Sequence, residues 1–160
     1  MKSESDQIKR AWDLMENLGF CLLVTHRGEG FHGRPMMAIV KVGERRIYFL
    51  SNRHSASEDE FASQPNVYLG FSDASSKYVS LYGKASLHDE RELVRKLWTT
   101  GAQAYFPEGP ESPDAVVISV EPQTAEYWDG PAGPIGMVKI AFAAATGQIP
   151  NMGEHAKIAI

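Results

Sequence analysis

The chain has 160 residues, of which 22% are charged and 43% hydrophobic, and its formal net charge is −4. This length favours one domain with its own core, and the acidic balance argues against nucleic acid or an anionic membrane as a partner. The single cysteine excludes an intrachain disulfide framework, and no segment reaches the ~20 apolar residues of a membrane span. The polar first residues do not predict a secretory signal, so we expect a cytoplasmic location.

The first fifty residues predict one helix followed by strands. Apolar residues at helical spacing predict a helix within residues 1–19, which Gly19 can end in a left-handed turn. A short apolar run predicts a buried strand over 20–25. Gly28-Glu29-Gly30 is a hairpin signal. Further strands are therefore predicted at 31–42 and 47–51.

The middle and end of the chain alternate between short strands and short helices. Ser55-Ala56-Ser57-Glu58 fits a capping box that begins a helix. The clearest alternation runs over 78–87, where odd-numbered positions face one side and even-numbered ones the other. We expect other strands at 67–72, 115–120 and 125–128, with Pro122 interrupting the last two, and helices from Asp89 and over 135–146.

These elements predict a mainly β fold. The strands are short and follow one another at hairpin spacing, and the helices do not alternate with them one for one. This pattern is typical of a small antiparallel β-barrel with flanking helices and disfavours a doubly wound parallel sheet.

Arg34 is the first candidate binding residue. A guanidinium in an apolar strand is costly unless its charge is paired, although an exposed arginine on an edge strand is the simpler interpretation. The predicted helix start downstream supplies free N–H groups that attract anions. Ser55 and Ser57 add hydroxyl groups, and Arg53 and His54 add positive charge. Together these features indicate a site for a phosphorylated cofactor.

The aromatic residues leave more than one interpretation open. Trp128 precedes a Pro/Gly loop and can stack on a planar ligand or pack in the core or in an interface. Tyr78 and Tyr82 can line a groove, an interface or plain surface. The five histidines show no ligand spacing, so we predict no metal site. No G-x-S-x-G motif or dinucleotide fingerprint is present, and the prolines among Gly130–Gly136 remove N–H donors.

Several short motifs occur in order along almost the whole chain. They are Gly-Phe-His-Gly-Arg-Pro-Met at 30–36, Ile-Tyr-Phe-Leu-Ser-Asn at 47–52, Gln-Pro-Asn-Val at 64–67, Phe-Ser-Asp at 71–73, Tyr-Val-Ser-Leu-Tyr-Gly at 78–83, Tyr-Phe-Pro-Glu-Gly-Pro at 105–110, Ala-Glu-Tyr-Trp-Asp at 125–129 and Gly-Glu-His-Ala-Lys at 153–157. In order and spacing the chain resembles the pyridoxamine 5′-phosphate oxidase-like, FMN-binding split barrels, within them the bacterial general stress protein branch.

The resemblance implies a six-stranded antiparallel split barrel. It further implies one FMN-binding domain over residues 1–160, with an N-terminal helix within 1–19 and a loop, helix and tail over 130–160. The partner it implies is a second copy of the chain, with two FMN sites at the interface of the homodimer. If the protein is a reductase, a nicotinamide electron donor is a further candidate partner and would bind transiently over the flavin.

The resemblance also assigns cofactor-binding residues by position. Arg34 would contact the FMN phosphate, and the backbone of Pro35, Met36 and Met37 would run beside the isoalloxazine ring. Ser51 and Asn52 would lie near the ribityl-phosphate arm, Ser55 and Ser57 near the phosphate, and Trp128 would come from the partner subunit. No residue stands out as an acid–base catalyst, and we nominate none.

Two positions depart from the family pattern. Ser57 stands where relatives carry lysine, and Ala56 where the classical oxidases carry arginine. Each lost charged hydrogen bond is worth roughly 1.5–3 kcal/mol, so FMN affinity is expected to fall about ten- to hundred-fold. The hypotheses are an FMN-dependent oxidoreductase of unknown substrate, an FMN-binding module without turnover, a flavin-free dimeric scaffold, and a relative that binds a deazaflavin or haem.

Overall fold

The computed structural model describes residues 2–56, 58–131 and 133–160. Within them, eight antiparallel strands form one sheet in the order β2-β1-β5-β6-β7-β4-β3, with β8 added beside β7. The strands are β1 Phe20–Arg27, β2 Gly30–Met37, β3 Ile39–Lys41, β4 Arg46–Asn52, β5 Asn66–Ser72, β6 Lys77–His88, β7 Ala115–Asp129 and β8 Glu154–Ala159. The helices are α1 Glu4–Leu18, α2 Glu58–Ser63, α3 Arg91–Leu97, α4 Thr100–Tyr105 and α5 Gly133–Thr146, with 3-10 turns at Val42–Glu44 and Gly109–Glu111.

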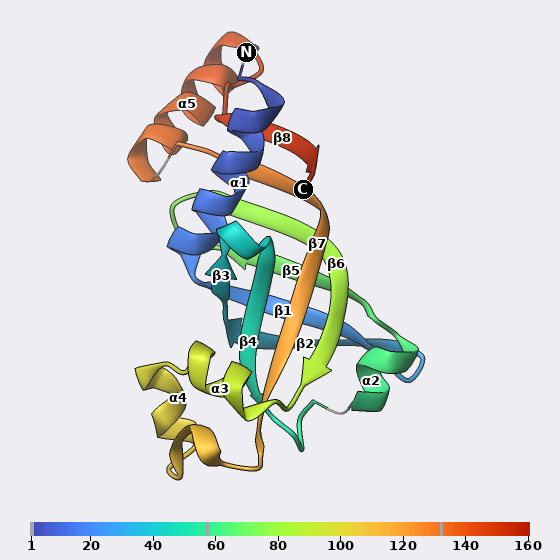
Figure 1. Ribbon diagram of the computed structural model, residues 1–160. Coiled ribbons are helices and arrows are strands. Elements are labelled where there is room, and N and C mark those ends of the chain that lie inside the picture. Colours follow the sequence, from blue (N-terminus) through green and yellow to red (C-terminus); the bar gives the residue numbers. More distant parts are fainter. Residues whose placement is uncertain (1, 57, 132) are drawn as a thin grey trace.

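The sheet curls strongly on itself, and the helices flank it (Figure 1). The predicted mainly β, antiparallel barrel with flanking helices is thus confirmed, with eight strands among the described residues where six were expected. The additional strands have two sources. The strand predicted over 31–42 divides into β2 and β3, and the C-terminal tail contributes β8.

The division falls at Ala38, whose N–H still donates to the carbonyl of Gly19 (2.7 Å), in register with the β1–β2 pairing. On the two sides of this residue the chain has different partners. β2 pairs with β1 as the predicted hairpin, whereas β3 pairs with β4. The chain crosses from one side of the curled sheet to the other at this point.

Two further expectations about the strands are wrong. Pro122 does not interrupt β7, because it lies at a β-bulge opposite Gly83 where a missing N–H is tolerated. A Cβ at Gly83 would lie 2.6 Å from the carbonyl oxygen of Glu121, so this close approach requires glycine. β1 is buried on one face only, since Phe20 and Leu22 are exposed.

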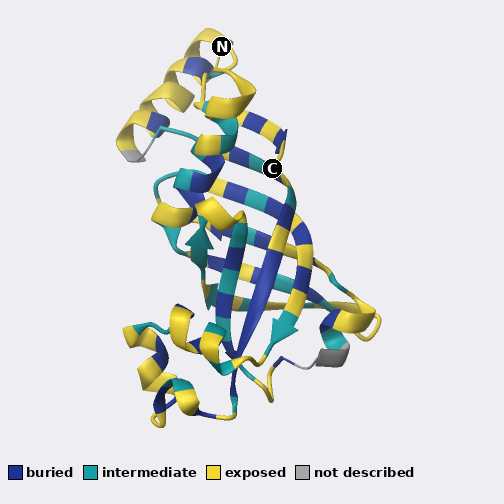
Figure 2. Cartoon of the chain, viewed as in Figure 1, coloured by how far each residue is buried: buried dark blue, intermediate teal, exposed yellow. Residues whose placement is uncertain are grey.

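The core fills the inside of the curl. Apolar side chains of alternating strand positions pack there against α1, whose Ala11, Trp12, Leu14 and Met15 are buried. β7 is buried on both faces over residues 115–120, because α3 and α4 cover its other side (Figure 2). Cys21 lies in the main core, and burial raises the pKa of its thiol to about 12.

Asp129 ties α1, β6 and β7 together. Its carboxylate accepts from Arg10 (2.6 Å) and from Lys77 (3.0 Å). Burial raises the pKa of Asp129, but the hydrogen bonds from Lys77 and Arg10 outweigh burial and hold that pKa below its ordinary value. The ionised carboxylate therefore stabilises the fold.

Replacing Asp129 with asparagine should lower the free energy of unfolding near neutral pH by about 1.5–3 kcal/mol, the range for a hydrogen bond to a charged group. Because the folded pKa lies below the unfolded one, this stabilisation is complete above about pH 5 and is lost as pH falls through the folded pKa. Urea unfolding of both proteins from about pH 7 to about pH 3 measures the difference. Asp13→Asn, which breaks only the exposed pair with Lys9, is the control. A difference that does not change with pH would contradict this account.

Candidate functional site

An apolar cavity of about 520 Å³ lies between the start of β1, the end of β2, β4 and α4. Six of the residues predicted from the sequence to hold a cofactor line it. They are Pro35, Met36, Met37, Ser51, Asn52 and Ser55. Residues that lie on three separate segments of the sequence are thus brought to one hollow.

The remaining wall of the apolar cavity was not predicted. It consists of Phe20, Ile39, Leu50, Thr99, Gly101, Ala102, Tyr105 and Phe106. Three of these residues, Gly101, Ala102 and Tyr105, belong to α4, which is only six residues long. The signal that could have found it is Thr99, whose side chain caps α4 by accepting from the Ala102 N–H. An apolar hollow of this size with a few polar groups suits a planar organic ligand.

A second, polar cavity of about 460 Å³ adjoins the first at Ser55, which lines both. Its wall comes from the β1–β2 hairpin, the loop after β4, and α2. The residues are His26, Arg27, Gly28, His54, Ser55, Glu60, Ser63 and Gln64. The apolar cavity and the polar cavity therefore lie next to each other, with Ser55 between them.

Asn52 shapes the loop between the cavities. Its side-chain oxygen accepts from the His54 N–H (2.8 Å), and its carbonyl accepts from the N–H groups of Ser55 and Ala56. The Ser55 hydroxyl donates to the same carbonyl (3.0 Å). Ala56 is fully buried in the main core, so the position where the classical oxidases carry arginine does not face the cavities. Ser57, predicted to lie near a phosphate, is outside the described residues.

Arg34 is paired within the chain. Its Nη2 donates to Glu60 Oε1 (2.6 Å) and to the Thr25 hydroxyl (3.1 Å), and its Nη1 donates to the carbonyl of Ser55 (2.7 Å). The Arg34 and Glu60 side chains are 12% and 14% exposed. The buried charge is therefore compensated by a residue that the sequence did not single out.

The alternation of β2 explains where Arg34 points. Leu23, its partner across the sheet, is buried, so Arg34 lies on the inner face, whereas Pro35 is on the outer face. Among the described residues Arg34 lines neither cavity, and Glu60 lines the polar one. The Nε of Arg34 and the Nδ1 of His32 are buried without a hydrogen-bond partner. The predicted anion-binding arginine thus lies behind the Glu60 carboxylate.

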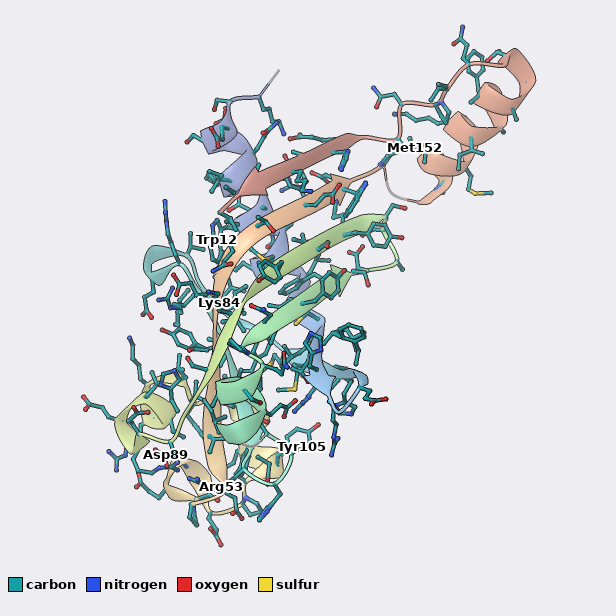
Figure 3. All side chains as sticks on the ribbon, turned by 90° about the vertical axis from the view of Figure 1, so that its right-hand side faces the viewer. Trp12, Arg53, Lys84, Asp89, Tyr105 and Met152 are labelled. Carbon is teal, nitrogen blue, oxygen red and sulfur yellow. The ribbon has the colours of Figure 1, made fainter. Side chains whose placement is uncertain are left out.

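The other two predicted cations are also next to carboxylates. Arg53 lies 3.3 Å from Asp89, and His54 lies 3.4 Å from Asp114. Figure 3 shows Arg53 and Asp89 at the same end of the molecule as Tyr105 of the apolar cavity. α2 is six residues long, which leaves only a short helix to attract an anion. Positive charge at this end of the molecule is present but largely matched.

Trp128 is not near either cavity within one chain. Asn52 of the cavity is opposite Ala115 in the sheet, and Trp128 follows Ala115 along β7 by roughly 40 Å of extended strand. Its indole stacks on His155 of β8, with ring centroids 5.0 Å apart. The structure describes eight of the predicted site residues. Six of them line the apolar cavity, and the other two, Arg34 and Trp128, line neither cavity.

Exposed aromatic side chains cross the outer face of the sheet. Tyr78 is opposite Trp128, and Tyr68 is opposite Tyr82. All four are exposed, and we call them the outer aromatic strip. Leu22, also exposed, lies on the same face of β1 as Phe20 of the apolar cavity. The strip therefore continues towards the cavity.

Comparison with known proteins identifies the family. A family model described as pyridoxamine 5′-phosphate oxidase like matches residues 6–151. The chain belongs to this family. The oxidase-like family was expected from the order of the sequence motifs and is confirmed.

Individual relatives agree with this membership. General stress protein 26 of Bacillus subtilis (strain 168) is 30% identical over 84 residues, which are 48% of this chain and 57% of that protein. The chain spans about half the length of the curated relatives it matches.

Solved structures share the split-barrel fold of this oxidase-like chain. A general stress protein 26 from Jannaschia sp. CCS1 has a TM-score of 0.79 at 24% identity and covers 99% of this chain and 100% of its own. A protein described as the general stress FMN/FAD binding protein of Xanthomonas citri has a TM-score of 0.68 at 20% identity, covering 78% and 89%. Among the described residues, no helix is long and apolar enough to cross a membrane.

Proposed function

We propose that this protein binds a flavin, FMN in the first instance, with the ring in the apolar cavity. The observation that carries the proposal is the convergence of Pro35, Met36, Met37, Ser51, Asn52 and Ser55 on that cavity. Supporting it, a structure of similar fold is described as an FMN/FAD binding protein, and another as FMN binding.

The residues of the apolar cavity fit the ring of a flavin. Leu50, Ile39 and Phe106 offer apolar contact, and Ser51 and Asn52 add polar groups on one side. A volume of about 520 Å³ lies within the range of small-molecule sites. A bound flavin supplies electron and hydride transfer, while the chain orients the ring and excludes water. The described residues that line the cavity include no histidine, carboxylate or lysine to act as an acid–base catalyst.

The same proposal includes a homodimer formed through the outer face of the sheet. Tyr105 and Phe20 are 83% and 63% exposed, so the apolar cavity is open to one side. The outer aromatic strip has the residue types that interfaces favour. A second copy seated on this face would cover the cavity, and Trp128 of the partner subunit would approach the ring.

Two alternatives keep the flavin but differ in chemistry, and a third lacks it. In the first, a nicotinamide donor binds transiently over the flavin and reduces it, which makes the protein an oxidoreductase of unknown substrate. In the second, the flavin is held without turnover. In the third, the chain is a flavin-free dimeric scaffold.

Titration of cofactor-stripped protein with FMN tests the proposal. We expect saturable quenching of flavin fluorescence and a solution mass of two chains by light scattering. Rapid anaerobic reduction of the bound flavin by a nicotinamide donor would favour the oxidoreductase over a protein that binds the flavin without turnover. Absence of binding at high micromolar FMN would overturn flavin binding, and a one-chain mass at micromolar protein would overturn the dimer.

A further inference from the structure

We propose that this site does not select for the phosphate group of the flavin, and that it binds riboflavin about as tightly as FMN. This inference rests on the proposed function, because it concerns the end of the same ligand. It follows from the position of Glu60, which already satisfies the arginine that would otherwise bind the phosphate.

The first step is the state of the Arg34 donors. Both terminal nitrogens are engaged, one by Glu60 and Thr25 and the other by the carbonyl of Ser55. Of the five guanidinium N–H groups, the buried Nε–H and one Nη1–H remain without a partner among the described residues, and these two do not lie side by side on the same edge of the group. A bidentate grip on phosphate needs two donors directed at the ligand. Arg34 does not offer them while the pair with Glu60 is intact.

The second step is the cost of releasing Arg34. Glu60 is almost as buried as Arg34, and the Thr25 hydroxyl donates to the same oxygen, Oε1, at 2.6 Å. A phosphate that took Arg34 would leave this carboxylate buried without its cation, which is strongly unfavourable. The pair is therefore a stable arrangement and competes with the ligand.

The third step is the sign of the charge that a ligand meets. Glu60, and not Arg34, lines the polar cavity. Among the described residues of that wall, Arg27 is the one arginine and Glu60 the one carboxylate, so their charges balance. Arg53 and His54 are next to Asp89 and Asp114. A phosphate that carries nearly two negative charges gains little from a balanced wall and is repelled by the nearby carboxylate.

The fourth step is the complementarity of a hydroxyl group. Riboflavin ends in a neutral hydroxyl, which donates to a carboxylate, whereas ionised phosphate oxygens only accept. Glu60 at the polar cavity therefore suits the neutral side chain at least as well as the phosphate. The affinity of the site comes from the ring in the apolar cavity, which both flavins share.

The test compares the two flavins on wild-type protein and on Glu60→Gln. In the wild type we expect dissociation constants for FMN and riboflavin within about three-fold of each other. In Glu60→Gln, Arg34 loses its anionic partner, so FMN binding should tighten roughly ten-fold while riboflavin binding does not. Glu16→Gln removes the same charge from the exposed face of α1, away from α2 (Figure 1), and should change neither.

The outcomes separate this inference from the proposed function. FMN binding at least ten-fold more tightly than riboflavin to the wild type would overturn the inference and leave flavin binding intact. Binding of neither flavin would overturn the proposed function itself. Equal or tighter riboflavin binding supports the inference. If Glu60→Gln does not fold, the ratio of the wild-type dissociation constants for FMN and riboflavin still tests the inference. A second test is the salt dependence, since the FMN affinity should not fall as salt is raised.

Discussion

Replacing Arg34 with methionine is expected to lower the free energy of unfolding by about 3–5 kcal/mol. Methionine keeps the length of the side chain but removes the cation that faces Glu60, and both side chains are mostly buried. The carboxylate is then left without its partner, apart from the Thr25 hydroxyl. Urea unfolding followed by circular dichroism measures the loss.

A double variant tests whether the loss comes from the unpaired charge. Arg34→Met combined with Glu60→Leu removes both charges, and it should recover most of the stability, because a buried ion pair can be replaced by apolar groups at little cost. Arg53→Met is the matched control, since Arg53 and Asp89 are largely exposed and their pair is worth at most about 1 kcal/mol. An equally small loss for Arg34→Met would show that the Arg34–Glu60 pair is not held as the structure has it. Loss of flavin binding in any Arg34 variant is interpretable only after this measurement.

Replacing Gly101 with leucine is expected to weaken the binding of FMN and riboflavin by about a hundred-fold or more. Gly101 lies in α4 and lines the apolar cavity, and a Cβ there would be 3.8 Å from the Cε of Met37. That contact is ordinary, so the first atom fits and the rest of the leucine side chain enters the space proposed for the ring. Leucine also has the higher helix propensity, so α4 itself is not disrupted.

Gly43→Leu is the matched control for this substitution. A Cβ at Gly43 meets no atom within 4 Å, and the residue lies in an exposed turn between β3 and β4. Titration of both variants with both flavins should show loss only for Gly101→Leu. Unchanged affinity in that variant would place the ring outside the apolar cavity. Loss of FMN binding alone would place the phosphate, rather than the ring, near α4.

Regular alternation and turn chemistry made much of the fold predictable. β6 shows alternating burial over 78–86 as expected, Gly28-Glu29 forms the two-residue turn of the β1–β2 hairpin, and Gly19 ends α1 with a φ of 71°. These features are local, since each depends on residues close together in sequence. β8 was missed because its pairing with β7 joins segments 25 to 35 residues apart, which no local pattern reveals.

In the candidate site, too, the local features were predictable and the contacts between distant segments were not. The six predicted residues that line the apolar cavity lie in short motifs or within three residues of one, where the family pattern places them residue by residue. The partner of Arg34 could not be predicted, because Glu60 is 26 residues away on another element and only packing brings the two together. The assignment of Arg34 to a phosphate remains a prediction, and its pairing with Glu60 is the reason to test it.

The thiol of Cys21 is a chemical probe for opening of the barrel core. Only the thiolate reacts with alkylating and disulfide reagents, and the buried thiol has its pKa raised to about 12. Modification of the native protein therefore requires the core around Cys21 to open, and its rate measures how often that opening occurs. Phe20, the next residue, lines the apolar cavity. A ligand that holds Phe20 in place should slow the labelling of Cys21, so occupancy can be followed by chemical modification without any optical signal from the ligand.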